Sequence, residues 1–103
     1  MADLDDPITY LFVPADRPER FAKALASGAD RVIIDLEDAV TSKNKTVGRN
    51  AVKSAGLNWS RIIIRINDVT SSEFECDVSV LSRLPVQTIM VPKADGQTCL
   101  QRV

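Results

Sequence analysis

The chain of 103 residues contains no histidine, and it has only two cysteines. The absence of histidine excludes Ser-His-Asp and Cys-His nucleophilic systems and every metal site that depends on imidazole ligands. Cys76 and Cys99 have neither a metal-ligand nor a redox spacing, so we expect two reduced thiols in packing or surface positions. Any chemistry must therefore come from carboxylates, lysine, arginine or a bound ion.

Long apolar runs and an excess of one charge are also missing. The apolar runs are far shorter than the roughly 20 residues that cross a bilayer, and the acidic N-terminus lacks the apolar core of a signal peptide. The formal net charge is −1, and no basic cluster with interleaved aromatic residues occurs. We therefore expect a cytoplasmic protein that binds neither membranes nor nucleic acid.

What is present is the composition of an ordinary globular domain. Hydrophobic residues make up 45% of the chain and charged residues 26%, and a chain of this length is enough for one small domain. No linker or low-complexity segment divides it, so we expect a single domain over residues 1–103.

Four short apolar runs recur along the chain. Each is rich in β-branched residues and nearly continuous rather than alternating, which is typical of strands buried on both faces of a parallel sheet. The four runs span residues 10–13, 31–36, 62–66 and 88–91. They predict four parallel strands.

Helices are expected between the runs. For the first helix, Asp16 and Glu19 resemble a capping box, and Gly28 fits a helix stop. The second is expected from about residue 43 to residue 55, closed by Gly56.

A third helix is expected to start at Ser72, which forms a capping box with Glu75, and to end before Pro85. Its apolar stripe consists of Phe74, Val78 and Leu81. A fourth helix is expected to begin near Gly96.

Strands that alternate with helices in this order predict a parallel α/β sheet. Two architectures fit: a small open doubly wound sheet, and part of a TIM barrel. No Gly-x-Gly-x-x-Gly follows the first run, and no Gly-x-x-x-x-Gly-Lys-Ser/Thr occurs. The absence of both motifs argues against the nucleotide-binding versions of the open sheet.

Carboxylates gather where the second run ends, at Asp35, Glu37 and Asp38. Active sites of parallel α/β folds form at the carboxyl ends of the strands, and Asp35 and Glu37 point to the same face of an extended strand. Carboxylates after a buried strand are costly unless they are paired, hydrated or metal-bound. We expect an active-site role for them. The alternative is that they pair with a nearby lysine or arginine and only shape the loop.

Arg65 lies inside the isoleucine-rich third run, where an arginine that faced an apolar core would be expensive. We expect its guanidinium to project into a polar mouth and to bind a substrate carboxylate with two parallel hydrogen bonds. The alternative is a structural ion pair with Asp35 or Glu37.

Other strand ends carry further charges. Arg17 and Arg20 stand beside a helix N-terminus, where they would attract an anion such as phosphate; the alternative is a cap with solvated charges. For Lys93, after the fourth run, nothing in the sequence supports a Schiff-base role. We expect an electrostatic or structural role there.

Taken together, these strand ends resemble the citrate lyase β-subunit and malyl-CoA lyase-like family of metal-dependent aldolases, in its N-terminal part. The matching segments are residues 11–21, 32–40, 45–49, 64–67 and 91–94. Several motifs in the right order are more specific than any one of them. A departure is Ala15, where the family usually has glycine, because a methyl group there narrows the loop or changes its φ preference.

The resemblance implies the N-terminal half of a TIM (β/α)8 barrel, with four parallel strands and intervening helices. It implies a carbon–carbon lyase that cleaves a β-hydroxy acyl thioester, such as a citryl thioester of coenzyme A or of an acyl carrier, to a keto acid and an acetyl thioester. It implies Mg2+ as the cofactor that stabilises the developing charge. The family's substrate-binding arginine carries over to Arg65, with Glu37 and Asp38 as wall of the same mouth. No catalytic residue carries over.

The resemblance also places the two metal-binding carboxylates of the family on later strands, beyond Val103, so this chain is expected to hold no metal ligand. A TIM barrel takes about 250 residues. We therefore expect a barrel cut after its fourth strand, with backbone groups exposed on the first and fourth strands and little lyase activity by itself. The implied partners are the thioester substrate and either further copies of the chain or other lyase subunits.

Two alternatives stay open. One is a non-catalytic half-barrel, a binding or assembly module or truncated gene product that pairs through its open edges with another copy or with a separate second half. The other is a self-contained flavodoxin-like domain with an unknown ligand, which four strands and three or four helices allow.

Overall fold

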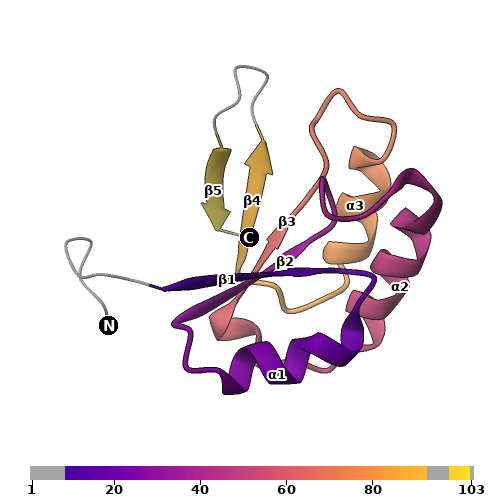
Figure 1. The fold of residues 1–103 in the computed structure, drawn as a ribbon. Coiled ribbons are helices and arrows are strands. Elements are labelled where there is room, and N and C mark those ends of the chain that lie inside the picture. The colour runs from indigo at the N-terminus through magenta and orange to yellow at the C-terminus, as the bar shows by residue number, and fades with distance from the viewer. Residues whose placement is uncertain (1–8, 93–97, 103) are drawn as a thin grey trace.

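The computed structural model describes residues 9–92 and 98–102. Its centre is a twisted sheet in which four parallel strands lie side by side in chain order (Figure 1). The strands are β1 (Tyr10–Pro14), β2 (Arg31–Asp35), β3 (Ile62–Arg65) and β4 (Thr88–Pro92). The expected α/β fold with four parallel strands is confirmed.

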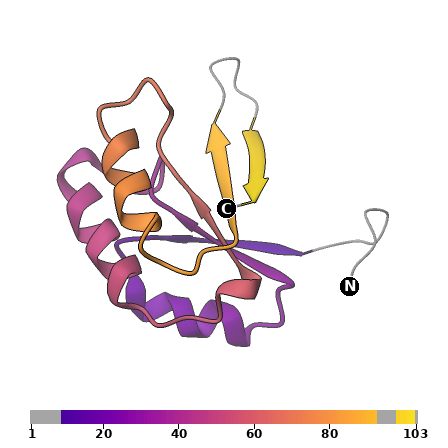
Figure 2. The same ribbon diagram turned by 180° about the vertical axis from the view of Figure 1, so that it is seen from behind.

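Three α-helices connect these strands, namely α1 (Phe21–Ala26), α2 (Lys45–Ser54) and α3 (Phe74–Leu81). Figures 1 and 2 show all three on one side of the sheet, as expected for right-handed βα units. The predicted stops of the first two helices are confirmed, since Gly28 has φ +92° and Gly56 has φ +58°. Glycine adopts this left-handed conformation without the steric cost that a side chain brings.

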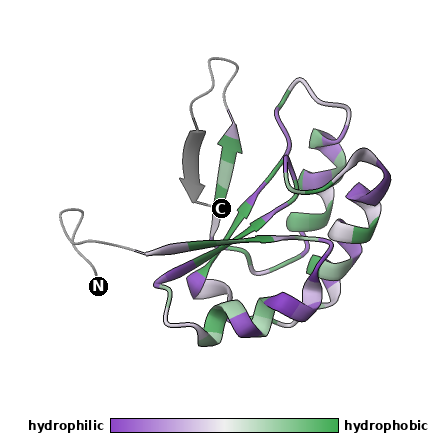
Figure 3. Cartoon of the chain, viewed as in Figure 1, coloured by the Kyte–Doolittle hydropathy of each residue, from purple (hydrophilic) through white to green (hydrophobic). Residues whose placement is uncertain are grey.

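The core lies between the sheet and the helices, and Figure 3 shows hydrophobic residues along the strands and on the helices. Alternate residues of the strands point into it and are fully or almost fully buried: Val13, Val32, Ile34, Ile62 and Ile64. Phe21 and Ala24 of α1, Val52 of α2 and Leu81 of α3 pack against them. Burial of this apolar surface is the main stabilising term of the fold.

Two helix starts differ from prediction, because neither expected capping box forms. Asp16 makes no cap hydrogen bond; its Oδ2 accepts one from Asn44 Nδ2 at 2.9 Å, and Arg17 stands at the N-cap of a 3₁₀ turn at Pro18–Arg20. Helix α3 begins two residues later than expected, with Glu73 at its N-cap and no side-chain cap. At the first helix, Asn44 takes the carboxylate that would have capped it. Before α3, Ser71 Oγ rather than Ser72 accepts from a backbone amide, that of Glu73 at 3.0 Å.

The expected fourth helix is also wrong. Gly96 lies outside the described residues, and the segment after it forms strand β5 (Thr98–Arg102), which pairs antiparallel with β4. Backbone groups on the free edge of β4 need partners, and a returning strand supplies them where a helix would not. The edge of β4 that was expected to be exposed is therefore covered.

The opposite edge of the sheet, β1, pairs with β2 alone among the described strands. Three consecutive large side chains on it are exposed: Tyr10 (47%), Leu11 (39%) and Phe12 (51%). Among the described strands, the outer edge of β1 is therefore free. None of the helices in the described part of the chain has the length and apolarity that crossing a membrane requires.

Candidate functional site

The carboxyl ends of β2 and β3 bring three charged side chains together on the face of the sheet opposite the helices. Asp35 and Arg65 are the last residues of neighbouring strands, and the parallel register sets them side by side. Arg65 Nε donates to Asp35 Oδ1 at 2.9 Å, and Nη2 donates to Oδ2 of the same carboxylate. Glu37 Oε1 lies 3.5 Å from Arg65 Nε. We call Asp35, Glu37 and Arg65 the arginine cluster.

Asp35 is the fixed member of the arginine cluster, because it is only 1% exposed and its oxygens accept four hydrogen bonds. Besides Arg65, the backbone amides of Glu37 and Ala39 donate to it, at 2.8 and 3.1 Å. Although burial opposes ionisation, these hydrogen bonds hold the pKa of Asp35 below its ordinary value. The buried carboxylate therefore stays charged and sets the direction of Arg65.

Arg65 is held on two sides and remains accessible on a third. Its Cζ lies 5.3 Å from the centroid of the Phe12 ring, a cation–π distance. The side chain is 19% exposed, and no described residue accepts a hydrogen bond from Nη1. A guanidinium carries five N–H donors, so this arrangement leaves donors for a bound carboxylate. The structural ion pair with Asp35 is thus present, and binding of a substrate carboxylate stays a prediction.

The two remaining acids differ from each other in environment. Burial raises the pKa of Glu37, and the neighbouring negative charge of Asp38 raises it further. Asp38 is exposed and pairs with no described side chain. Glu37 therefore meets Arg65, as expected for one wall of the site, whereas Asp38 stands at its solvent side.

A second polar group, which the sequence analysis did not identify as a site, lies where α2 and α3 approach the same strand ends. Lys45 is 8% exposed, and its Nζ donates to Leu36 O at 2.8 Å, to Glu37 O at 2.6 Å and to Asn67 Oδ1 at 2.9 Å. Its three N–H donors therefore all have acceptors.

The same group continues through Asp77, a fully buried carboxylate of α3. Its Oδ2 accepts from Asn67 N and Nδ2, at 2.8 and 2.6 Å, and its Oδ1 accepts from Arg49 Nη1 at 2.9 Å. Glu73 Oε1 also lies 2.9 Å from Arg49 Nη2. We call Lys45, Arg49, Asn67 and Asp77 the lysine cluster. No buried side-chain nitrogen or oxygen of the described residues lacks a hydrogen-bond partner.

A signal for the lysine cluster does exist in the sequence. Lys45, Gly48, Arg49 and Val52 follow the i, i+3, i+4, i+7 spacing of one helix face, and all four are buried. Two cations on the core-facing stripe of a helix require buried acceptors. The identity of those acceptors depends on contacts between residues far apart in the chain.

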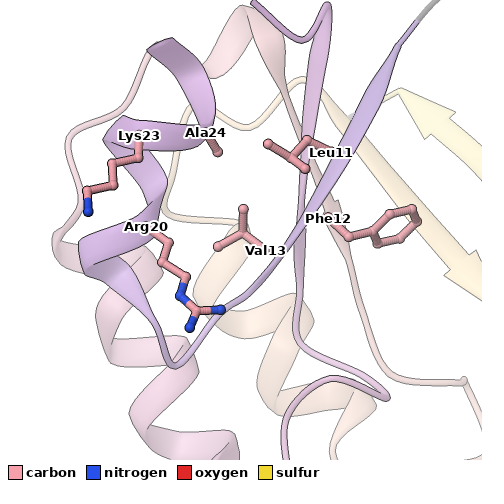
Figure 4. A pocket seen from close by; sticks show the side chains of 6 residues that line it. All are labelled: Leu11, Phe12, Val13, Arg20, Lys23 and Ala24. Carbon is pink, nitrogen blue, oxygen red and sulfur yellow. The ribbon is translucent and has the colours of Figure 1, made fainter. Parts of the chain in front are cut away.

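The two arginines that were expected to attract an anion lie elsewhere. Arg17 and Arg20 are exposed, and neither side chain pairs with a described residue. Arg20 and Lys23 border a groove of about 390 Å3 between β1 and α1, and Leu11, Val13 and Ala24 form its floor (Figure 4). Phe12, which contacts Arg65, points to the other side of β1 in Figure 4. The structure therefore does not bring Arg20 together with the arginine cluster, and anion binding there stays a prediction.

Ala15, where the resemblance led us to expect glycine, is accommodated without backbone strain. It is fully buried, and in the part of the chain that the structure describes no residue other than glycine has a positive φ. Its methyl group faces Gly48 of α2, where an added Cβ would lie 3.1 Å away. The methyl group therefore packs under the helix and away from the loop surface.

Comparison with known proteins gives a consistent picture. Residues 9–103 match the HpcH/HpaI aldolase/citrate lyase family model. A citrate lyase subunit beta-like protein of Mycobacterium tuberculosis is 45% identical over 87 residues, covering 84% of this chain and 32% of that protein. The L-malyl-CoA/beta-methylmalyl-CoA lyase of Cereibacter sphaeroides is 37% identical over 90 residues, covering 81% of this chain and 28% of that enzyme.

Among solved structures, the citrate lyase beta subunit of M. tuberculosis in complex with oxaloacetate and magnesium superposes with a TM-score of 0.78. The two are 46% identical, and the match covers 82% of this chain and 38% of that one. The chain spans about a third of the length of the curated relatives it matches. Sequence and fold agree, and the chain belongs to the HpcH/HpaI aldolase/citrate lyase family.

Proposed function

We propose that this chain forms one wall of the active site of a carbon–carbon lyase, in which Arg65 binds a carboxylate of the keto-acid half of the substrate. The observation that carries the proposal is the state of Arg65: Asp35 and Phe12 fix its direction, while Nη1 remains without an acceptor among the described residues. A solved relative binds oxaloacetate, which carries two carboxylates.

The substrate class we propose is a β-hydroxy acyl thioester, of which citryl, malyl and citramalyl thioesters are the candidates. In such a cleavage the hydroxyl loses its proton and becomes the carbonyl of the keto acid, while the electron pair of the broken carbon–carbon bond passes to the α-carbon of the thioester. That carbon then takes up a proton. The chain's own contribution is to bind and orient the keto-acid carboxylate through Arg65, with Glu37 restricting access beside it.

Magnesium belongs to the proposal for the whole enzyme, because a solved relative binds it. The described residues do not fit a magnesium site by themselves: they contain no group of three His, Cys, Asp or Glu residues that would hold a metal ion. Both oxygens of Asp35 are already occupied by hydrogen bonds. We therefore propose that the ligands lie outside the described residues, and we assign no step to the metal here.

The test has two parts. A chimaeric barrel, in which this chain replaces the matching segment of the M. tuberculosis relative, is expected to cleave a citryl or malyl thioester. Arg65→Ala in that barrel is expected to raise KM strongly and to lower kcat/KM by about 30- to 140-fold, because two bonds to a charged group contribute about 2–3 kcal/mol. The exposed Arg83→Ala is the matched control. Unchanged kinetics for Arg65→Ala would sink the assignment.

The 103-residue chain alone is expected to show little or no cleavage. Magnesium-dependent cleavage of citryl-CoA or malyl-CoA by the purified chain would overturn that part of the proposal. We also infer a cytoplasmic setting and assembly with further copies or with other lyase subunits.

A second candidate function, a non-catalytic assembly module, is favoured by the open edge of β1. Tyr10, Leu11 and Phe12 are exposed on a strand that has one partner among the described strands, and such edges pair readily with other chains. Sedimentation at micromolar concentration tests it. A monomer that unfolds cooperatively would count against the assembly module and would leave the lyase proposal untouched.

A further inference from the structure

The loop between β2 and α2 carries Glu37 and Asp38. Backbone bonds hold it in part, since Leu36 N donates to Arg65 O at 2.8 Å and Val40 N to Glu37 O at 3.3 Å, and charged side chains bind further peptide groups of the loop. The Glu37 amide donates to Asp35 Oδ1 at 2.8 Å, and the Glu37 carbonyl accepts from Lys45 Nζ at 2.6 Å. The preceding Leu36 carbonyl accepts from Lys45 Nζ at 2.8 Å and from Asn67 Nδ2 at 3.0 Å. The backbone at Leu36 and Glu37 is thus bound by two opposite charges: the Asp35 carboxylate accepts from the Glu37 amide, and the Lys45 ammonium donates to both carbonyls.

The group that binds the two carbonyls is itself tightly fixed. Lys45 and Arg49 stand one turn apart on the buried face of α2. Arg49 binds Asp77, and Asp77 binds both the backbone and the side-chain nitrogen of Asn67, the third partner of Lys45. The position of the ammonium is therefore determined by α2, by α3 and by the end of β3 together.

From this geometry we propose that Lys45 is a positioning residue of the site: by binding the Leu36 and Glu37 carbonyls, its ammonium fixes the loop so that Glu37 stands beside Arg65. The significance of that placement rests on the proposed function, since Arg65 and Glu37 form the wall that meets the keto acid. Lys45 reaches the site through the backbone of Glu37 and has no contact of its own with the cluster of Asp35 and Arg65.

A merely stabilising lysine would behave differently from a positioning one. Loss of general stability speeds amide exchange throughout the fold, because exchange of core amides follows the free energy of global opening. Loss of positioning speeds exchange in the loop alone and changes the surroundings of Arg65. The fully buried Val52, on the same helix, is a suitable comparison, because Val52→Ala lowers stability without touching the loop.

The experiment measures native-state amide exchange by NMR in the 103-residue chain. Lys45→Met keeps most of the packing volume and removes all three donors. It is expected to speed exchange of the Glu37 and Ala39 amides at least about tenfold more than exchange of the Ile64 amide, and to shift the Arg65 Nε–H resonance. Val52→Ala is expected to speed exchange of the Glu37, Ala39 and Ile64 amides by the same factor and to leave the Arg65 Nε–H resonance unshifted. Lys53→Ala, at an exposed position, is expected to change neither the exchange rates nor the resonance.

Equal acceleration of the Glu37, Ala39 and Ile64 amides in Lys45→Met would overturn the proposal and leave Lys45 a stabilising residue. If Lys45→Met does not fold, Lys45→Arg replaces it, because a guanidinium keeps the charge but does not donate to three acceptors from one nitrogen. Faster exchange confined to the loop of that variant supports positioning, and uniform or unchanged exchange contradicts it.

Malonate titration, followed through the Arg65 Nε–H resonance, separates this proposal from the proposed function. Weaker malonate binding in Lys45→Met, with unchanged binding in Val52→Ala, supports both. If malonate does not bind the original chain, Arg65 is not a carboxylate site in this chain, while the exchange rates still decide whether Lys45 positions the loop.

Discussion

The arginine and lysine clusters stand at the same end of the sheet and differ in what remains free. In the lysine cluster, Asp77 is fully buried, and all three donors of Lys45 have acceptors. In the arginine cluster, Arg65 is partly exposed, and its Nη1 has no acceptor among the described residues. A closed polar network holds structure, and an open one is available to a ligand. The lysine cluster therefore supports the site, and the arginine cluster forms the surface that a ligand can reach.

The largest loss of stability is expected for Asp77→Ala, which tests whether the lysine cluster is the rigid one. It leaves the Arg49 guanidinium, only 10% exposed, without its buried partner. It also leaves the Asn67 backbone N–H without an acceptor, while Asn67 Nδ2 keeps only its bond to Leu36 O. Breaking a buried ion pair by removing one partner costs about 3–5 kcal/mol. We expect a loss of that size in urea unfolding, with the exposed Glu75→Ala on the same helix as control. A loss below about 1 kcal/mol would mean that the lysine cluster is not the rigid one.

Asp35→Asn is expected to cost less, about 1–3 kcal/mol, because Arg65 can turn to solvent when its partner loses charge. Its effect on malonate affinity should exceed its effect on stability, since Arg65 loses its fixed direction. The same urea unfolding and an NMR titration measure the two quantities. A variant that loses stability as strongly as Asp77→Ala but binds malonate normally would reverse the comparison.

At the margin of the lysine cluster, Glu73→Ala should lower the free energy of unfolding only slightly, by about 0–1 kcal/mol. Glu73 binds the same guanidinium as Asp77, but its side chain is 31% exposed, so water replaces it at little cost. Urea unfolding of Glu73→Ala beside Asp77→Ala shows whether burial, rather than the number of ion pairs, determines the contribution. Equal losses would contradict that explanation.

The smallest expected effect concerns pH. The raised pKa of Glu37 means that the folded chain holds this proton at pH values where the unfolded chain has lost it, so stability should fall as pH rises from about 4.5 through the folded value. Asp35 acts in the opposite sense. Its lowered pKa adds stability above about 3.8, and that stability is lost as pH falls through the folded value. The free energy of unfolding of Glu37→Gln, measured from pH 3 to pH 7, should lack the decline with rising pH that Glu37 causes. It should keep the decline with falling pH that Asp35 causes.

The strand–helix order was predictable because it depends on local patterns. Continuous β-branched runs gave the four parallel strands, and Gly28 and Gly56 marked two helix ends. The first capping box did not form because Asp16 binds Asn44 in the folded chain. The second did not form because α3 begins at Phe74, with Glu73 rather than Ser72 at its N-cap. The last segment became a strand because the edge of β4 needed backbone partners.

The site was predictable only in part, for a similar reason. The sequence pointed to Arg65 and Glu37 because charged residues at the end of an apolar run are unusual, and the structure places the two side chains together; their role in substrate binding stays a prediction. The partners of Lys45 and Arg49 were missed, because Asn67 and Asp77 lie 22 and 28 positions away from them and only the fold brings them together. The malonate titration decides whether Arg65 binds a carboxylate in addition to its ion pair with Asp35.

The contact between Ala15 and Gly48 has a consequence for the evolution of this chain. Ala15 is fully buried and Gly48 is buried, and a Cβ at Gly48 would lie 3.1 Å from the Cβ of Ala15. A second methyl group there would require one of the neighbours to shift by a few tenths of an ångström. A change from Ala15 and Gly48 to glycine at 15 and alanine at 48 takes two substitutions. The intermediate sequence has glycine at both positions or alanine at both. The intermediate with no methyl group leaves a small void, and the one with two has a tight contact, so each carries a small cost. Substitutions at these two distant sites are therefore expected to occur as a pair.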